Sequence, residues 1–547
     1  MVTDILAAIV PKDRWCRRAL VVAVAAVLLG LLLVVTGLRF PGAAAIAVGC
    51  ALLGLGAPAV AVWLMVILLP VHPFAMRVAT VDLGFGGREL LLLSAWKEIV
   101  LGAILLSVGI SLARRGLPPR PRELISRLTA TDALAAALVV LVALWLVAAP
   151  SLAAVNQVRL LLFPIAVYVV LRTGIVPTRG LPLTAAVAVT VIGVFGFLQS
   201  TFFGWDWVIK YYGTPGLPVP STFAATGVEG PRAAGTLASP NEFAFVVGTG
   251  LIMALVLAGR GRGRATLGFT LLVAGLAAGL VLSFSRSTLI GVGLAVVTLG
   301  VAAVILGSWG RRTVLRVVAV AAPSLALALV LFVSRGGLDL AASTIVTAPG
   351  PAPAPAPGAT PVASGPPASP TATTVGDPSA AGHVASIRRA VDAIVDHPLG
   401  LGLGVVGART GPGDAAAEPL IVESWFLSLG LTFGWLGLLW AAFVPFAFWR
   451  SGLRATRLLP AIGLMTVGSA TMVAVNGFVL PTMLEPQVAL LPWVLVAVAE
   501  GALASGSDET AQPRAGGATA QGVIAAGELP PRPLGRPPRW PRPSGPR

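Results

Sequence analysis

Long apolar stretches, separated by short charged or glycine-containing breaks, make up most of this 547-residue chain. The stretches are about 18 to 22 residues long, the length at which a helix crosses the hydrocarbon core of a bilayer. They show no period of two, so the pattern predicts helices and not the strands of a membrane barrel. The approximate spans are 19–37, 42–57, 58–73, 91–112, 132–149, 159–176, 182–203, 241–258, 266–283, 287–308, 317–334, 421–447, 458–475 and 488–503.

These spans predict an all-α, polytopic integral membrane protein with about 12 to 14 transmembrane helices. Only Gly54, Gly56 and Pro58 separate the second span from the third, so a count of about thirteen is the alternative. The predicted organisation is a cytoplasmic N-terminus (1–18), transmembrane helices (19–334), a large extracytoplasmic loop (335–420), further transmembrane helices (421–503) and a disordered basic cytoplasmic tail (504–547).

The basic residues predict how the chain is oriented in the membrane. Most of the 38 lysines and arginines fall in loops and termini that the predicted spans place on one side. The positive-inside rule assigns that side to the cytoplasm, so both termini are cytoplasmic and the long loops 204–240 and 335–420 face outward. The net charge of +16 invites a nucleic-acid interpretation. However, the arginines stand singly or in small groups at helix ends, and we expect no nucleic-acid partner.

The composition supports a membrane protein. Hydrophobic residues make up 56% of the chain and charged residues 11%, whereas soluble domains carry about 25% charged residues. Cys16 precedes the first span and Cys50 lies in the second, so no disulfide framework is predicted. Residues 347–372 are rich in proline and alanine, a composition typical of an extended tether that buries no core.

A polar region between residues 377 and 437 interrupts the apolar pattern and holds two of the three histidines. Its glycine run, Pro398-Leu399-Gly400-Leu401-Gly402-Leu403-Gly404, lets the backbone approach another group closely. The Gly-Lys-Ser/Thr of a phosphate-binding P-loop does not follow it. No set of His, Cys, Asp and Glu has metal-ligand spacing, so we predict neither a metal nor another cofactor.

Two arginines lie at helix ends where their charge needs a protein or headgroup partner. Arg286 interrupts apolar sequence between the ninth and tenth spans without a loop to solvate it, and ionisable groups at such depth usually face a cavity. Arg232 lies shortly before Ser239 and Asn241, either of which can cap the next span. A guanidinium offers a planar fork of donors that suits phosphate oxygens. The alternative is that Arg286 reaches lipid headgroups and only ends two helices.

Glu423 and His383 are the candidate general bases. Glu423 stands in the first turn of its span, where the helix dipole favours a negative charge. His383 can exchange a proton near neutral pH. Opposite one or two arginines, such a base would activate a hydroxyl for attack beside a phosphate leaving group. The alternatives are a carboxylate placed for the dipole alone and an ordinary loop histidine.

Taken in order, these motifs resemble the O-antigen ligase and O-antigen polymerase superfamily. The similarity covers roughly residues 185 to 450, and its motifs are Arg232-x-x-Gly235 to Asn241, Ser285-Arg286-Ser287, Gly382-His383, the Pro398–Gly404 run, and Glu423-Ser424 with the later Gly434-x-x-Gly437. Ligases of the family usually carry His-Asn where this chain has Glu423-Ser424, and often Arg where His383 stands. These departures favour a polymerase over a ligase.

The resemblance implies a metal-independent glycosyltransferase with a GT-C-like fold. It would transfer glycan from an undecaprenyl-diphosphate carrier to an acceptor hydroxyl at the outer face of the bacterial cytoplasmic membrane. The implied partners are the undecaprenyl-diphosphate-linked oligosaccharide, the lipid bilayer and other polysaccharide assembly proteins. The implied site residues are Arg232, Arg286 and Arg388 for the diphosphate, Glu423 or His383 as the base, and Ser424, Asn241, Gly402 and Gly404 in support.

Two other classes of function fit parts of the pattern. A flippase for lipid-linked sugars or a small-solute permease would show internal repeats and mid-membrane charges. We find no repeat, and Lys97 and Glu98 lie near the outer end of the fourth span. A membrane scaffold explains the proline-rich tether but not the membrane-embedded Arg286. The sequence therefore favours chemistry at the outer face.

Overall fold

The computed structural model describes residues 13–114, 128–178, 180–213, 223–224, 228, 230–261, 264–337, 378–406 and 422–511. The side chains of residues 264, 378–383, 482 and 505–511 lie outside this description, as does the predicted tether 347–372. The regular elements of the described residues are all helices, which confirms the all-α prediction. The chain forms two compact units, Met1–Ala504 and Ser505–Arg547, and the first is described below.

Fourteen helical segments of the described residues are long and apolar enough to cross a membrane, which confirms a multi-pass membrane protein. The segments comprise α2 (Arg14–Val35), α3 (Arg39–Gly56), α4 (Pro58–Leu68) with α5 (His72–Val81), α7 (Trp96–Arg114), α9 (Ala130–Ala148), α10 (Leu152–Arg172), α11 (Leu181–Leu198) with α12 (Gly204–Tyr212), α13 (Pro240–Ala258), α14 (Arg264–Leu282), α15 (Arg286–Ile305), α16 (Arg311–Ser334), α19 (Trp425–Ala455), α20 (Pro460–Val479) and α21 (Pro486–Ala511).

The second and third predicted spans are separate helices. Ala57, between α3 and α4, has a non-helical φ of −142°. Pro58 then occupies the first position of α4, where its missing N–H is tolerated. The short sequence Gly56-Ala57-Pro58 therefore ends one span and begins the next.

Two predicted spans end too early. The third span, 58–73, continues through a 3-10 turn (Leu69–Val71) into α5, and the seventh, 182–203, continues through a π-helical turn (Gln199–Phe203) into α12. Pro70 removes a helix donor at the first junction. Gly204 adopts a φ of 66° at the second. Each residue interrupts one helix and lets another begin directly after it.

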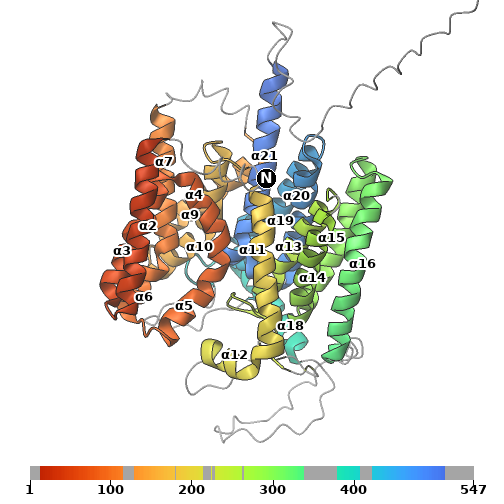
Figure 1. Ribbon diagram of the computed structural model, residues 1–547, viewed down its shortest axis with the longest axis horizontal. Helices are drawn as coiled ribbons and strands as arrows, with labels where there is room; N and C mark the ends of the chain where they lie inside the picture. The colour runs from red at the N-terminus through yellow and green to blue at the C-terminus, as the bar shows by residue number, and fades with distance from the viewer. Residues whose placement is uncertain are drawn as a thin grey trace, which may run out of the picture. The chain divides into compact units, whose positions relative to one another are not determined.

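Short helices occupy positions that the sequence predicted as loops. These are α5, α6 (Gly87–Ser94), α12 and α18 (Pro378–Asp396), and Figure 1 shows them at one end of the helix bundle, the lower end in that view. We call this the α12 end and the other the opposite end. Helix α21 continues to Ala511, past the predicted start of the tail at 504, because the next proline is Pro513.

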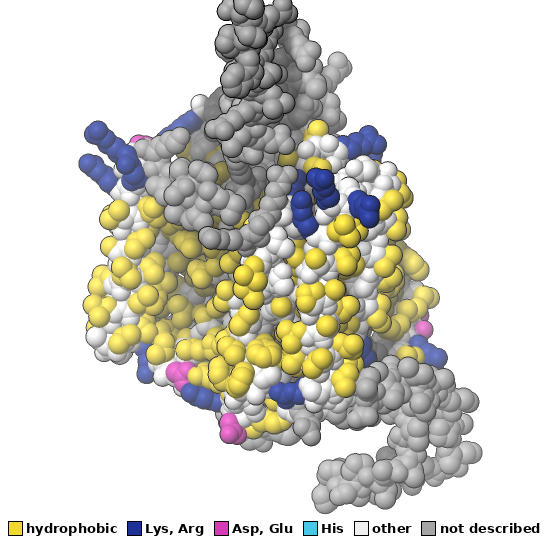
Figure 2. All heavy atoms as spheres, turned by 45° about the vertical axis from the view of Figure 1, so that its right-hand side comes forward, with side chains coloured by type: hydrophobic (Ala, Val, Ile, Leu, Met, Phe, Trp, Pro, Cys, Tyr) yellow, Lys and Arg dark blue, Asp and Glu magenta, His cyan; other side chains and the backbone are white. Residues whose placement is uncertain are grey.

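The surface of the helix bundle is divided into an apolar band and two charged rims. Figure 2 shows hydrophobic side chains over the band, with Lys and Arg gathered above and below it. Large apolar side chains on α2, α15 and α16 are exposed, for example Val35 at 78% and Ile305 at 76%. Contiguous exposure of this kind is expected of helices that face lipid.

Helix α13 forms the centre of the fold. Within its most apolar stretch of 18 residues, 89% is buried, because α11, α14, α15 and α20 pack around this helix. The start of α13, which carries Asn241 and Glu242, therefore lies inside the α12 end and not at its periphery.

A buried charge network joins four helices at the opposite end. Glu500 of α21 is 1% exposed and accepts hydrogen bonds from three hydroxyls: Tyr168 at 2.6 Å, Thr129 at 2.8 Å and Ser451 at 2.7 Å. Arg172 lies 3.5 Å from Glu500 and 2.9 Å from Asp132. A carboxylate at this depth is tolerated only with such partners, so Glu500 links α21 to α9, α10 and α19.

Replacing Glu500 by leucine should lower the free energy of unfolding by about 3 to 5 kcal/mol. Ser451 would lose its Glu500 acceptor, and Tyr168 and Thr129 would keep only Asp132. Arg172 would lose one of its two carboxylates. Glu500→Gln retains an acceptor and should lose less. Thermal unfolding in detergent measures the difference, with Asp392→Asn on exposed α18 as the control; equal melting of the Glu500→Leu variant and the wild type would contradict this role.

Candidate functional site

Residues 231–239, between α12 and α13, form a buried segment that is not helical. Ala233, Ala234 and Leu237 have no exposed surface. Irregular backbone inside a membrane protein must have its polar groups satisfied by neighbouring protein, because lipid offers no partners. The buried segment 231–239 therefore needs partners from the surrounding helices.

The side chain of Gln199 hydrogen-bonds to the backbone of this segment. Its side chain is completely buried, and its Oε1 accepts from the backbone N–H of Ala234 at 3.0 Å and of Gly235 at 2.7 Å. One side chain thus satisfies two successive donors. Gly235 has a φ of 58°, and a Cβ there would meet the Phe243 ring at 2.7 Å, so glycine is required at this turn.

Several other elements fix the same segment. The bonds run from Ser200 Oγ to Pro231 O (2.7 Å), from Ala233 N to Leu282 O (2.8 Å), from Tyr212 Oη to Gly235 O (2.9 Å), from Thr236 Oγ1 to Pro70 O (2.8 Å) and from Phe74 N to Thr236 O (3.1 Å). The segment is therefore held by α5, α11, α12 and α14 at once, and it cannot move without unpairing buried polar groups.

Arg232 projects from this fixed segment. Its Nε donates to Ser283 O at 2.7 Å and its Nη2 to Asn241 Oδ1 at 3.0 Å. Burial, and after it the charge of Arg286, lowers the pKa of the Arg232 guanidinium to about 10. The two arginines singled out from the sequence thus lie close enough to repel one another, and Arg232 keeps part of its surface exposed.

A strained residue positions Arg286. Phe284, in the turn between α14 and α15, has a φ of 50°, a conformation that is unfavourable by about 1 to 3 kcal/mol for a bulky side chain. The turn is stabilised by Ser283 Oγ, which accepts from Ser285 N at 3.2 Å. Arg286 is then the first residue of α15, so the positive end of a helix dipole adds to its charge.

Glu423 and Ser424 are joined to the same neighbourhood through the end of α20. Ser424 caps α19 and donates to Gly477 O at 3.1 Å. The preceding residue of α20, Asn476, accepts from Thr288 in the first turn of α15 at 2.9 Å. Glu423 therefore precedes the cap and does not stand in the first turn of the helix as predicted, and its side chain is partly exposed. Adjacent residues of α20 therefore hold both the Arg286 turn and the cap that follows Glu423.

Two further charged residues belong to this region and were missed in the sequence. Glu242, next to Asn241, is 9% exposed and accepts from Gln487 Nε2 at 3.1 Å and Ser239 Oγ at 3.3 Å. The Ser239-x-x-Glu242 spacing was available as a signal, but it also fits an ordinary capping box. Arg335, at the end of α16, donates to Ser200 O at 3.3 Å. The sequence predicts it as the first residue of the large loop 335–420 and gives no sign of this contact.

The glycine run packs against protein. Gly400, Gly402 and Gly404 have φ values of 90°, 95° and 85°. A Cβ on Gly400 would lie 2.5 Å from Thr432 O, and one on Gly404 2.7 Å from Ala154 N. The predicted close approach is present, but its partners are helices α10 and α19.

Helix α19 opens to receive this run. Gly434 interrupts α19 with a φ of 64°, which leaves Leu431 O and Thr432 O to accept from Leu401 N and Gly402 N at 2.6 and 3.1 Å. In return, Trp435 N donates to Pro398 O at 3.1 Å. Gly402 thus bonds to α19, whereas Gly404 donates to Gln157 Oε1 of α10 at 2.6 Å.

Arg388 and His383 lie on α18, which packs on α19 through a small apolar cluster containing Ala390, Ile394 and Leu431. Arg388 is exposed, and among the described residues no contact joins it to Arg232 or Arg286. The side chain of His383 lies outside the described residues. Among the described contacts, Glu423 is linked to the Arg286 turn only indirectly, through its neighbour Ser424 and the end of α20, and Arg388 has no such link.

A second charged cluster lies where α5, α7 and α10 meet. Lys97, 6% exposed, has its Nζ 3.3 Å from Glu98 Oε1 and 3.2 Å from His72 Nε2. Arg159 Nε lies 3.3 Å from the same Glu98 oxygen. Both Glu98 oxygens are buried without hydrogen-bond geometry to any described residue. The cluster therefore combines ionisable groups of both signs within 3.2 to 3.3 Å of one another.

Replacing Gly434 by alanine should destabilise the fold by at least about 1 to 3 kcal/mol. Its Cβ would fall on Pro398 O, and the left-handed backbone disfavours any side chain. Gly268→Ala in α14, where a Cβ would meet no atom within 4 Å, is the matched control and should be neutral or stabilising. Thermal unfolding in detergent compares them; similar melting temperatures would show that α19 can close at Gly434.

Comparison with models of protein families and with curated proteins finds no match for this chain. The resemblance to the O-antigen ligase and polymerase superfamily therefore rests on the sequence motifs alone.

Proposed function

We propose that this protein is a membrane glycosyltransferase that moves glycan from an undecaprenyl-diphosphate carrier to an acceptor hydroxyl at the outer membrane face. The observation that carries the proposal is that Arg232, on a buried non-helical segment, donates to Ser283 O at 2.7 Å, in the turn that leads directly to Arg286. A diphosphate leaving group carries the opposite charge, and it would relieve the repulsion between the two guanidinium groups.

The proposed reaction is a direct displacement at the anomeric carbon. The acceptor hydroxyl oxygen forms the new glycosidic bond while the bond between the anomeric carbon and the diphosphate oxygen breaks. The leaving diphosphate takes the bonding electrons, and Arg232 and Arg286 stabilise its developing charge. Glu423 takes the proton of the acceptor hydroxyl, with His383 as the other candidate. Polymerisation of a lipid-linked glycan is favoured, and ligation to a lipid or protein acceptor is the alternative within this class.

Rigidity supports this assignment. Arg232 is attached to a segment whose backbone is bonded on every side, and Arg286 follows a strained turn. Donors held in place before the substrate arrives lose little energy to reorganisation, which is the usual basis of charge stabilisation in active sites. Asn476 and Gly477 of α20 bond to Thr288 and Ser424, and Ser424 directly follows Glu423, the proposed base.

A transporter of lipid-linked sugars is the second candidate, and the Lys97–Glu98–Arg159–His72 cluster is the observation that favours it. Ionisable groups of both signs inside transmembrane helices are typical of ion or proton pathways. Transport would move the lipid-linked sugar without breaking its bond to the diphosphate. The two candidates therefore differ in whether a new glycosidic bond appears.

Arg286→Ala should lower glycan transfer by about 10²- to 10³-fold, and Glu423→Gln by about 10²- to 10⁴-fold, while both proteins still insert and fold. Liposomes that contain purified protein and radiolabelled undecaprenyl-diphosphate oligosaccharide report longer chains and released carrier diphosphate. Arg454→Ala, at the opposite end, is the control. Wild-type activity in both variants would refute the assigned roles, and label that crosses the bilayer without a new bond would favour the transporter.

Transfer should continue undiminished in the presence of a metal chelator. In the proposed mechanism the arginine pair, and not a divalent ion, neutralises the diphosphate. The same liposome assay with and without chelator tests this, with the melting temperature measured in parallel. Loss of activity that added Mg²⁺ restores, at unchanged melting temperature, would contradict the arginine-only mechanism.

A further inference from the structure

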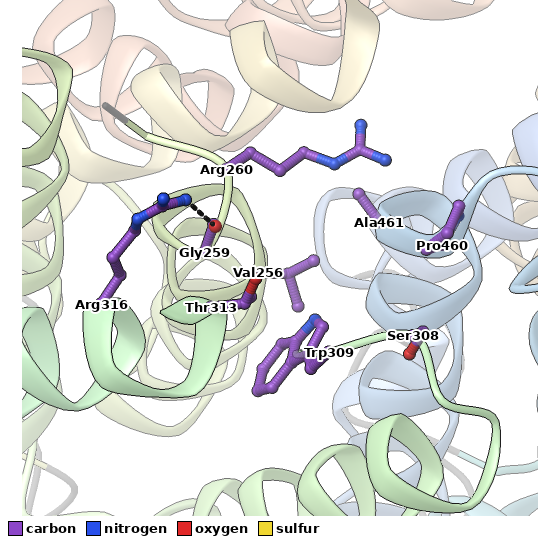
Figure 3. A pocket seen from close by; sticks show the side chains of 9 residues that line it. All are labelled: Val256, Gly259, Arg260, Ser308, Trp309, Thr313, Arg316, Pro460 and Ala461. Carbon is purple, nitrogen blue, oxygen red and sulfur yellow. Dashed lines mark hydrogen bonds between the residues drawn. The ribbon is translucent and has the colours of Figure 1, made fainter. Parts of the chain in front are cut away.

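A cavity of about 300 Å³ opens at the opposite end of the bundle, on the far side of the fold from Arg232. It lies where the end of α13 meets the turn between α15 and α16 and the first turn of α20. Figure 3 shows the side chains that surround it. The lining residues are Val256, Gly259, Arg260, Ser308, Trp309, Thr313, Arg316, Pro460 and Ala461.

The polar part of the lining is suited to an anion. It consists of two arginines, Arg260 and Arg316, and two hydroxyl residues, Ser308 and Thr313, and none of the nine lining residues is acidic. Arg316 Nη1 donates to Gly259 O at 3.4 Å, near the outer limit of a hydrogen bond. A guanidinium carries five N–H donors, so this single long bond leaves most of the Arg316 fork available.

The two arginines approach the cavity from different directions. In Figure 3, Arg316 comes from the first turns of α16 and bonds to the end of α13, whereas Arg260 extends toward Ala461 at the start of α20. Arg260 is exposed and Arg316 partly exposed. Both side chains line the same cavity, so an anion that enters it can contact both.

The remaining wall is apolar. Val256, Trp309 and Ala461 contribute hydrocarbon and indole surface next to the arginines. Helices α16 and α20 also begin here, at Arg311 and Pro460, and their N-terminal dipoles favour negative charge. Indole rings with basic residues at the edge of an apolar band are the pattern that proteins present to lipid headgroups.

We propose that this cavity binds the phosphate of an anionic phospholipid headgroup, from the leaflet at the opposite end of the bundle. Arg260 and Arg316 pair with the phosphate oxygens, Ser308 and Thr313 donate to the ester or glycerol oxygens, and the apolar wall contacts the first carbons of the lipid. The volume, at the lower end of the range of about 300 to 1,000 Å³ for ligand pockets, suits a headgroup and not a whole lipid.

The site is independent of the proposed transferase activity. Arginines at this end also serve as orientation signals, and that role depends on their number and side, not on their place in a cavity. Arg311 and Arg312 belong to the same helix start as Arg316 but do not line the cavity. They provide a control pair with the same change in charge.

The test is stabilisation of the purified full-length protein by added phosphatidylglycerol in neutral detergent, compared with phosphatidylcholine. For wild type, we expect phosphatidylglycerol to raise the melting temperature in a saturable manner and phosphatidylcholine to have little effect. In the Arg260→Ala/Arg316→Ala variant the half-maximal concentration should rise about tenfold or more. The Arg311→Ala/Arg312→Ala variant should respond as wild type.

Three outcomes would overturn the proposal. The first is an Arg260→Ala/Arg316→Ala variant that folds and responds to phosphatidylglycerol as wild type does. The second is equal weakening in both double variants, which would mean that overall charge alone attracts the lipid. The third is a shift of the same size with soluble glycerol 3-phosphate, lost in the same variant, which would make the ligand a soluble phosphate. Melting temperatures measured without added lipid establish that each variant is folded.

Discussion

The architecture of the α12 end depends on the requirement that every backbone polar group of residues 231–239 find a partner inside the protein. In a water-soluble protein such a segment would hydrogen-bond to solvent at little cost; between transmembrane helices each unpaired group costs several kcal/mol. Gln199 satisfies two donors with one oxygen, Ser200 and Tyr212 each donate to a carbonyl of the segment, and the Thr236 hydroxyl ties it to Pro70 O. These side chains fix where the surrounding helices end, and they fix Arg232 with them.

The arginine pair follows from this rigidity. Two guanidinium groups move apart if their supports allow it, because their repulsion grows as surrounding protein displaces water. Here Arg232 belongs to the segment 231–239, whose backbone bonds to Gln199, Ser200 and Tyr212. Arg286 follows the strained turn at Phe284, and Thr288 in the same helical turn bonds to Asn476. Folding therefore holds like charges together before any ligand is present. An anion that binds between them gains interaction energy without rearranging its site.

The sequence was sufficient to predict the transmembrane helices, because span length and apolarity are local properties. It also located three interruptions of the apolar pattern, Arg232 to Asn241, Ser285 to Ser287 and the glycine run, which contain helix ends or non-helical backbone. It could not identify what each feature touches. The glycine run fits a close approach to a ligand as well as its contacts with α10 and α19. The partners of Glu242 and Arg335 are distant in sequence, and so the roles of these two residues became visible only in the fold.

The arginine pair alone does not distinguish the proposed transferase from a transporter, because both must hold a lipid-linked diphosphate. The distinguishing group is the carboxylate, since breaking the bond to the carrier requires a proton acceptor for the incoming hydroxyl and transport does not. Glu423 is attached to the arginine site through neighbouring residues of α20, Asn476 and Gly477. The Glu98 cluster lies where α5, α7 and α10 meet, whereas Arg232, Arg286 and Glu423 are connected through the ends of α14, α15 and α20. Arginines connected to a proton acceptor suit the departure of a charged leaving group, and this connection favours the proposed transferase.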